Sequence, residues 1–335
     1  MTERLTIPYS GTLLVSHLTA YGLAFVLDDV GIDAFVGHDT DSQSFEPTVL
    51  FEADRSAARD AIRVSAAAAE EIVEHDIEPN KTGNDRRATI WARGSMDRGS
   101  DRLAQVIKLR RELVEEANNA PSAVPAALLA GLGAPLSWGS ESTRTSSGAT
   151  AFDGVLGNNT SDFVRGVLRR TREAAAALDT DPFAPADQAS PPADKTGWAP
   201  PGAKITLVHQ WLAALGLALL PVAHRPLERS ATPAFWRRQD ERGVTLPLFD
   251  DAVSIPRLRA LLALDALTRI HSGHAEDEPA ANGTEPRAGG TPLPIEATVL
   301  RSLGVHEVVI FERRDRAGGK SSVAFDFARG RRVAL

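Results

Sequence analysis

"LLVSHLTAYGLAFVL", residues 13–27, is nearly all apolar and predicts a buried helix that ends at the acidic segment after it. The stretch "TLVHQWLAALGLALL", residues 206–220, aligns without gaps with "TLLVSHLTAYGLAFV", residues 12–26. Seven of the fifteen aligned positions are identical, including the Gly-Leu-Ala that begins at Gly22 and at Gly216. Buried helices rich in Ala and Leu resemble each other through composition alone, and we favour that explanation over an internal repeat.

The surrounding sequence alternates helical patterns with short strands. We expect an Ala-rich helix over residues 55–76 and a second helix over residues 101–118, which carries Leu and Ile on one side. "PTVLF" at residues 47–51 and "ATIWA" at residues 88–92 are expected strands. This alternation predicts an α+β fold of mixed helices and short strands.

The C-terminal sequence predicts a β-hairpin. "VHEVVIFERR" at residues 305–314 and "KSSVAFDFARGRRV" at residues 320–333 are separated by "DRAGG" at residues 315–319. The first run carries apolar residues on both faces, so we expect an internal strand. The loop places cationic side chains at the tip of the hairpin, away from any hydrophobic core.

Proline content indicates the domain boundaries. Residues 179–203 hold six prolines and few apolar anchors, which is typical of a linker or a loop laid on the surface. We expect an N-terminal α+β domain over residues 1–178 and a C-terminal helical region with the β-hairpin over residues 204–335. A polar stretch at residues 271–290 is expected to be a mobile insertion.

Composition restricts the class of protein. A hydrophobic content of 43% and a charged content of 24% are ordinary for a soluble globular protein. The chain has no cysteine, which excludes a disulfide framework, a thiolate nucleophile and a zinc-cysteine site. The start of the chain lacks the basic-then-apolar pattern of a signal peptide, and the most apolar run, residues 207–223, contains His209, Gln210 and Pro221. We expect a cytoplasmic protein without a membrane span.

Charge is distributed unevenly around the net value of −7. Residues 5–54 contain eight acidic residues and no Lys or Arg, so this segment could face a basic partner subunit. Residues 86–111 contain eight basic residues against two acidic ones, and residues 313–332 contain seven against two. Arginine greatly outnumbers lysine. A GC-rich genome explains most of that bias, while arginine also suits planar phosphate contacts.

A polar loop leads into a basic helix at residues 161–178. Apolar residues recur at helical spacing and predict one buried face. Arg165, Arg169 and Arg172 follow at i, i+4 and i+7, so we expect them to project from one exposed side. Such a stripe is either a solvated face or a phosphate-binding face, and we weigh these two interpretations about equally.

Catalytic patterns are weak in this sequence. "GGKSS" at residues 318–322 has Arg314 where a phosphate-binding loop requires its first glycine. The pairs His38-Asp39 and His75-Asp76 suggest a metal-dependent phosphohydrolase, but that chemistry needs further ligands converging on the metal. We therefore expect no enzyme activity, no cofactor and no metal.

The order of several segments resembles the large-subunit family of type I CRISPR effector (Cascade) complexes, in a short divergent form. The resembling segments are "LLVSHLTAYGLAFVL", "GAPLSWG", "GATAFDGVLGNNTSDFVRGVLR", "LVHQWLAALGLALLPVAHR", "SATPAF" and "LPLFDDAVSIPRLRALLAL". The resemblance implies a non-catalytic subunit that helps to recognise the short motif beside a DNA target and holds the opened strands. Its implied partners are target DNA, the complex containing CRISPR RNA, other effector subunits and the helicase-nuclease.

Two kinds of residue in this sequence are suited to binding nucleic acid. Arginine and lysine clusters suit phosphates, and small polar loop residues suit base edges. The candidate nucleic-acid-binding residues are Lys81, Asn84, Arg86, Arg87, Asn158, Asn159, Thr160, Arg165, Arg169, Arg172, Arg313, Arg314, Arg316 and Lys320. Two alternatives remain open: a phosphohydrolase or nuclease that uses the His-Asp pairs, and a scaffold subunit that binds only protein.

Overall fold

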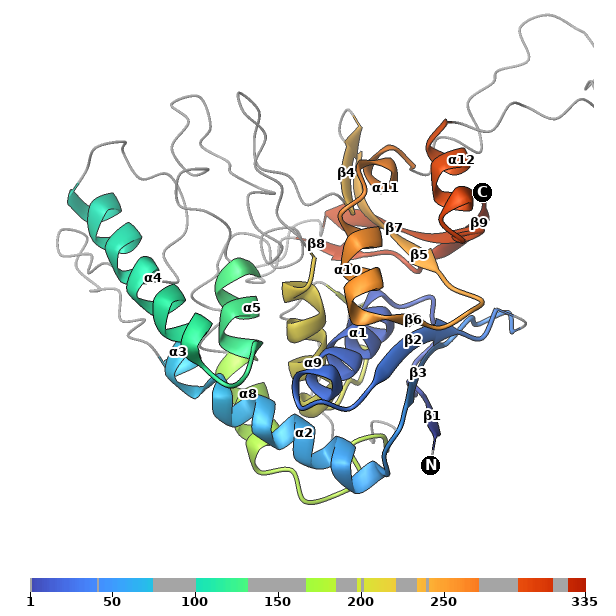
Figure 1. Ribbon diagram of the computed structural model, residues 1–335. Helices are drawn as coiled ribbons and strands as arrows, with labels where there is room; N and C mark the ends of the chain where they lie inside the picture. The colour runs from blue at the N-terminus through green and yellow to red at the C-terminus, as the bar shows by residue number, and fades with distance from the viewer. Residues whose placement is uncertain are drawn as a thin grey trace, which may run out of the picture.

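Two antiparallel sheets and a central pair of helices form the framework of the molecule (Figure 1). The computed structural model describes residues 2–40, 42–74, 101–131, 167–184, 198–199, 202–220, 234–238, 241–270, 295–315 and 325–335. Helices and antiparallel strands are mixed along the chain, which confirms the expected α+β class. No helix in these ranges is long and apolar enough to cross a membrane.

The first sheet has the strand order β1-β3-β2-β6. Its strands are β1 (Glu3–Thr6), β2 (Ala34–His38), β3 (Pro47–Phe51) and β6 (Val253–Ser254). Leu5, Val49 and Val36 stand in register across three strands and are buried against the helices. The short strand β6 comes from the C-terminal part of the chain and pairs with β2. The first sheet is therefore completed by residues about 200 positions further on.

The second sheet has the strand order β4-β5-β7-β8, and β9 also pairs with β7. Its strands are β4 (Phe235–Arg238), β5 (Glu241–Leu248), β7 (Glu307–Asp315), β8 (Phe325–Phe327) and β9 (Arg331–Ala334). Strand β7 has β5 on one side and β8 and β9 on the other, which confirms the expected hairpin and the internal position of its first strand.

The returning half of the hairpin is two short strands and not the single run that the sequence indicates. The strand stops between Phe327 and Arg331, where the chain passes close over β7. A Cβ on Gly330 would lie 2.5 Å from the ring of Phe311, so a side chain there would force this buried ring to move. The Gly330 amide turns away from the ladder and donates to the Thr12 carbonyl, 2.7 Å away.

Helices α1 (Leu14–Asp29) and α9 (Leu207–Ala218) lie side by side between the sheets and the outer helices (Figure 1). Every residue of α1 from Leu14 to Leu27 is buried, because the helix contacts the first sheet, α9 and α2. The sequence predicts this helix correctly. The two segments that resemble each other in sequence thus form one helix pair.

The remaining helices surround this pair. They are α2 (Arg55–Ala68), α3 (Glu70–Glu74), α4 (Asp101–Asn119), α5 (Val124–Gly131), α8 (Arg169–Ala176), α10 (Ile255–Leu262), α11 (Asp265–Arg269) and α12 (Ile295–Ser302). The helix expected over residues 55–76 is divided into α2 and α3 at Ala69, and α4 agrees with the expected residues 101–118. The expected strand at residues 88–92 lies outside the described residues.

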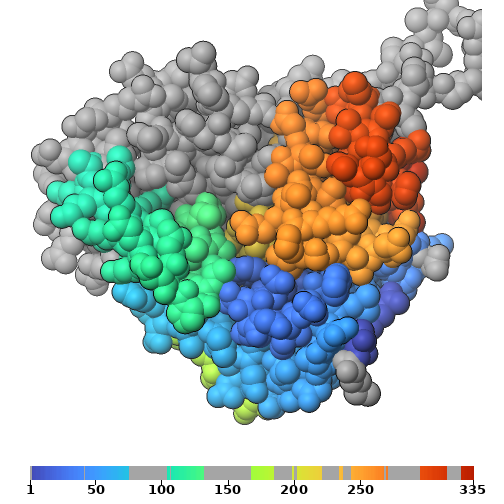
Figure 2. All heavy atoms as spheres, in the orientation of Figure 1, coloured from blue at the N-terminus to red at the C-terminus, as the bar shows by residue number. Residues whose placement is uncertain are grey.

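One hydrophobic core extends through both predicted domains. Residues 5–178 and residues 198–335 contribute to the same cluster, in which Trp211 of α9 donates to the Ser65 hydroxyl of α2 over 3.1 Å. The space-filling view shows the N-terminal residues forming the lower part of the molecule, with the C-terminal elements packed directly on them (Figure 2). The domain division at residues 179–203 stays a prediction, and the insertion at residues 271–290 lies outside the described residues.

Candidate functional site

Two buried histidines join the first sheet to the central helix. His17 of α1 and His38 at the end of β2 are both buried, with His17 Nδ1 lying 3.1 Å from His38 Nε2. The Phe249 amide, in the segment after β5, donates to His38 Nδ1 over 3.1 Å. At the other end, His17 Nε2 lies 2.7 Å from the Gly11 carbonyl oxygen. The pair therefore links four separate segments of the chain.

These contacts fix the protonation of both rings. Because His38 Nδ1 accepts from the Phe249 amide, its proton must sit on Nε2, which donates to His17 Nδ1. His17 then carries its proton on Nε2 and donates to the Gly11 carbonyl. Burial lowers the pKa of His17 to about 4, and burial together with the neighbouring His17 lowers the pKa of His38 well below its usual value. Both rings are neutral at pH 7.

The His17–His38 pair has a structural role, because all four ring nitrogens take part in hydrogen bonds. A metal ion or a substrate proton would have to displace one of these bonds. The His38-Asp39 version of the phosphohydrolase hypothesis therefore gains no support from the ring geometry of His38. His75 and Asp76, the other candidate pair, lie outside the described residues. Among the described residues there is also no group of three or more His, Asp or Glu side chains placed to hold a metal ion.

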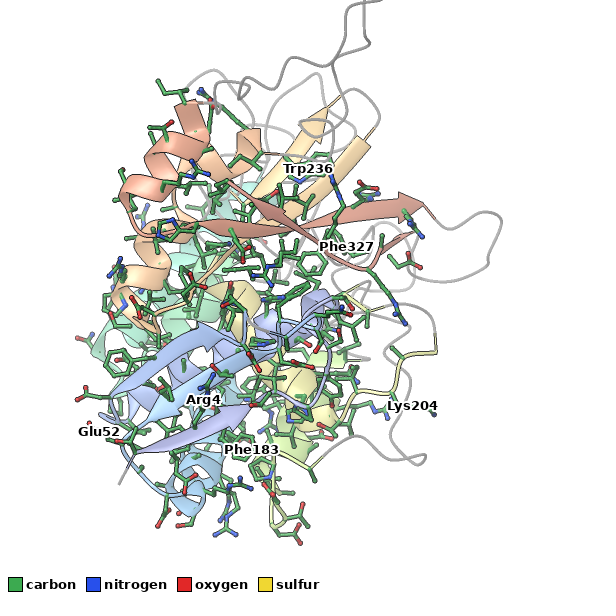
Figure 3. All side chains as sticks on the ribbon, turned by 90° about the vertical axis from the view of Figure 1, so that its right-hand side faces the viewer. Arg4, Glu52, Phe183, Lys204, Trp236 and Phe327 are labelled. Atoms are coloured by element: carbon green, nitrogen blue, oxygen red, sulfur yellow. The ribbon has the colours of Figure 1, made fainter. Side chains whose placement is uncertain are left out.

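An open polar pocket of about 1050 Å³ lies beside His38. It is between the first sheet and the end of the second sheet at which β7 begins and β9 ends. Figure 3 shows Arg4, one of its residues, on the first sheet below β7. The lining comes from six separate segments: Arg4, Thr6, His38, Asp39, Thr40, Asp250, Arg301, His306, Glu307, Arg332, Ala334 and Leu335. Charged and hydroxyl groups dominate this set, so the pocket suits a charged, hydrogen-bonding ligand.

Arg332 of β9 holds the two sides of the pocket together. Its Nε donates to a carboxylate oxygen of Glu307 over 2.6 Å, and its Nη1 donates to the Thr40 carbonyl over 2.6 Å. Glu307 belongs to β7 and Thr40 follows β2, so this side chain connects the two sheets. Two charge-assisted hydrogen bonds hold the guanidinium in one orientation.

Arg4 and Arg301 are not held in one orientation by described hydrogen bonds as Arg332 is. Both side chains are exposed, and among the described residues neither has an acidic side chain within ion-pair distance. Opposite charges are nevertheless present in the same pocket, because Asp39 and Asp250 line it as well. Sequence reasoning missed this site, since its arginines are about 30 to 330 residues apart and share no motif.

At the other end of β7, three neighbouring strands have arginines at nearby register positions. Arg237 of β4 stands directly opposite Arg242 of β5. Gly243, the next residue of β5, stands opposite Glu312, so β7 brings Arg313 and Arg314 to the same end of the sheet. Arg313 and Arg314, expected at the exposed tip of the hairpin, belong to strand β7, where Arg314 is exposed and Arg313 is half-buried.

The register determines which positions share a face at this end of the sheet. Arg238 is opposite Glu241, and Arg314 is opposite Asp326, so these positions lie on one face. The positions of Arg237 opposite Arg242, and of Arg313 opposite Phe327, lie on the other face.

The arginines of α8 are not arranged as the sequence suggests. Arg172 is only 7% exposed and lies 3.5 Å from the Glu74 carboxylate and 3.8 Å from that of Glu70. Arg169 lies 3.1 Å from Glu74 and also donates to the backbone carbonyl of Val73. The expectation of an exposed stripe is therefore wrong for Arg172, because α3 packs its glutamates against this face. A phosphate would compete with carboxylates already in place.

The other candidate residues lie outside the described residues: Lys81, Asn84, Arg86, Arg87, Asn158, Asn159, Thr160, Arg165, Arg316 and Lys320. Their assignment to nucleic-acid binding stays a prediction. A scan against protein-family models and a search of curated proteins each found no match to this chain.

Proposed function

We propose that this chain is a non-catalytic, nucleic-acid-binding subunit of a type I CRISPR RNA-guided complex, which helps to recognise and hold target DNA. The resemblance of its ordered segments to the large-subunit family suggests the class of complex. The observation that best supports a nucleic-acid partner is the opposition of Arg237 and Arg242 at the end of the sheet that also carries Arg313 and Arg314. Arginines close together on neighbouring strands suit phosphate groups.

The spacing of the strands suits a nucleic-acid backbone. Neighbouring strands lie about 4.8 Å apart, so arginines on three strands span about 10 Å across the sheet. Arginines at such positions suit the phosphates of a nucleic-acid backbone, which carry no sequence information. Binding at this end is therefore expected to be insensitive to sequence. Specific recognition of a short motif would fall to other residues of the chain or of the complex.

A salt series tests the proposal. Anisotropy of labelled single-stranded DNA with purified protein should show log K falling linearly with log salt between about 50 and 200 mM. Replacing Arg237, Arg242 and Arg313 with Ala should weaken binding and lower the slope by about 0.7 for each lost phosphate contact. The matched control is the double variant of Arg55 and Arg63, two exposed arginines of α2 with surface ion pairs. That variant should retain the slope.

Two further results decide the proposal. Co-expression with the other subunits of a type I effector complex and a guide RNA should allow the chain to copurify with an RNA-containing assembly. A chain that enters such an assembly but shows no salt-dependent DNA binding would be a scaffold that binds only protein. Cleavage of DNA by the purified chain with Mg²⁺ or Mn²⁺ would contradict the non-catalytic role.

A further inference from the structure

We propose that the pocket between the two sheets binds a nucleotide unit that carries a terminal phosphate. This inference goes beyond the proposed function, because the pocket lies at the opposite end of β7 from the sheet-end arginines. Glu307 begins β7 and lines the pocket, while Arg313 and Arg314 end the strand. Six or seven residues of extended chain separate the two sites by about 20 Å.

The phosphate would be held by Arg4 and Arg301. Arg4 stands on the outer face of β1 and Arg301 near the end of α12, so the two cations approach the pocket from different layers. Neither has an acidic partner among the described residues, so a ligand would not have to displace a described carboxylate from either arginine. Planar guanidinium groups and the nearby Thr6 hydroxyl are suited to phosphate oxygens.

The two carboxylates of the pocket favour one class of phosphate compound over others. Asp39 and Asp250 line the same pocket, and among the described residues no other side chain binds either carboxylate. Two carboxylates repel a bare inorganic anion, but they accept hydrogen bonds from amino and hydroxyl groups. A ligand that carries one phosphate and several donor groups satisfies both kinds of side chain. The amino groups and sugar hydroxyls of a nucleotide are such donors.

The size and rigidity of the pocket agree with this ligand. A volume of about 1050 Å³ accommodates a nucleotide with room for the next unit of a strand. Arg332, bound to Glu307 and to the Thr40 carbonyl, connects the two sheets at the pocket. The exposed His306 side chain lines the pocket and offers a flat ring on which a base can stack.

Calorimetric titration of the full chain tests the assignment. The probes are deoxynucleoside 5′-monophosphates, a short oligonucleotide with a 5′-phosphate, the same oligonucleotide without it, and inorganic phosphate. We expect the phosphorylated probes to bind, and each of Arg4→Ala and Arg301→Ala to weaken them by about tenfold or more. A stronger response to the phosphorylated oligonucleotide would identify a strand end as the source; a stronger response to the monophosphates would identify free nucleotides.

Two variants serve as discriminating controls. Arg259→Ala removes an exposed arginine of α10 that does not line the pocket, and nucleotide affinity should be unchanged. The double variant Asp39→Asn and Asp250→Asn should bind inorganic phosphate more tightly and reduce the preference for nucleotides. Both arginine variants remove exposed side chains, so loss of folding is not an expected cause of lost binding.

The proposal is overturned if no phosphorylated probe binds at about 1 mM, if inorganic phosphate binds as tightly as the nucleotides, or if Arg259→Ala is as harmful as Arg4→Ala. Its failure is distinguishable from failure of the proposed function. Variants of Arg4 and Arg301 should leave the salt dependence of DNA binding at the sheet end unaltered. Variants of Arg237 and Arg242 should leave monophosphate binding unaltered.

Discussion

Gly22 of α1 and Gly216 of α9 face each other where the two central helices cross. A Cβ on Gly22 would overlap the Leu212 carbonyl and lie 3.0 Å from the Gly216 amide nitrogen. A Cβ on Gly216 would overlap the Leu18 carbonyl and lie 3.0 Å from the Gly22 amide nitrogen. Each glycine thus contacts the residue four positions before the other. The crossing is reciprocal, so both helices need the same residue at the same place.

Replacing either glycine with alanine should destabilise the protein. Alanine is favoured over glycine inside a helix by about 1 kcal/mol, but the added methyl group would overlap a backbone carbonyl that cannot move independently. Overpacking of this kind costs about 1–3 kcal/mol or more, so we expect a net loss in the free energy of unfolding, measured in urea. Gly31→Ala is the control, since Gly31 has open space around it and only its φ of 81° opposes a side chain. Equal losses at Gly22 and Gly31 would contradict the crossing.

Tyr9→Phe and Tyr21→Phe should have different effects, although each removes one hydroxyl. The Tyr9 hydroxyl accepts from the Thr206 amide over 3.2 Å and donates to His209 Nδ1 over 2.7 Å. Its loss leaves both partners unsatisfied, and we expect a cost of about 1–3 kcal/mol in the free energy of unfolding. The buried Tyr21 hydroxyl has no hydrogen-bond partner among the described residues, so its removal should be neutral or stabilising. A larger loss at Tyr21 would refute this assignment.

Stability should fall as the pH is lowered from about 6.5 towards 4. Burial lowers the pKa of both His17 and His209 to about 4, and the pKa of buried His38 is lowered too. The unfolded chain binds protons on these residues below about pH 6.5 while the folded chain does not. Their neutral form therefore stabilises the fold fully above that pH, and each contributes a slope of up to about 1.4 kcal/mol per pH unit below it.

Urea unfolding at several pH values between 7.5 and 5 measures this slope. The variant His306→Gln changes an exposed histidine and leaves the buried network in place, so it should behave as the parent protein. A free energy of unfolding that stays constant across this range would show that the buried rings do not titrate on unfolding.

Arg172→Ala should reduce stability more than Arg170→Ala. Arg172 is buried against Glu70 and Glu74, whereas its neighbour Arg170 on the same helix is exposed. Removing Arg172 loses the ion pairs and the packing of its stem between α8 and α3. Because the glutamates remain partly exposed, we expect a loss of about 1–3 kcal/mol, visible as a lower midpoint in urea. If instead Arg172→Ala keeps full stability and weakens DNA binding, the arginine is part of the nucleic-acid interface.

Local patterns in the sequence predict several elements correctly. The apolar run at residues 13–27 forms α1, and "PTVLF" forms β3. The two C-terminal runs pair as a hairpin whose first strand, β7, is internal in the sheet. Each of these features is decided by residues close together in the chain. The burial of an entire helix also follows from its composition, since no polar face is available to water.

Long-range placement was not predictable from the same patterns. Nothing within residues 241–270 shows that Val253 and Ser254 complete a sheet begun near the N-terminus. The burial of Arg172 depends on Glu70 and Glu74, which come a hundred residues earlier. The pocket could not be predicted for the same reason, because Arg4, Arg301 and Arg332 come to line it only after both sheets have formed. Helical spacing specifies which residues share a face, but not which element will cover that face.

The position of α9 relative to α1 has a consequence for synthesis in the cell. The ribosome releases α1 first, and its main partner follows roughly 180 residues later, a delay of about 10 to 40 s at ordinary elongation rates. During this interval a helix without a polar face must be shielded by β1–β3 and α2, or by a chaperone. Slow codons between the two helices would lengthen the wait and should increase aggregation of the nascent chain. Fast translation through residues 30–206, or a bound chaperone, should increase the soluble yield.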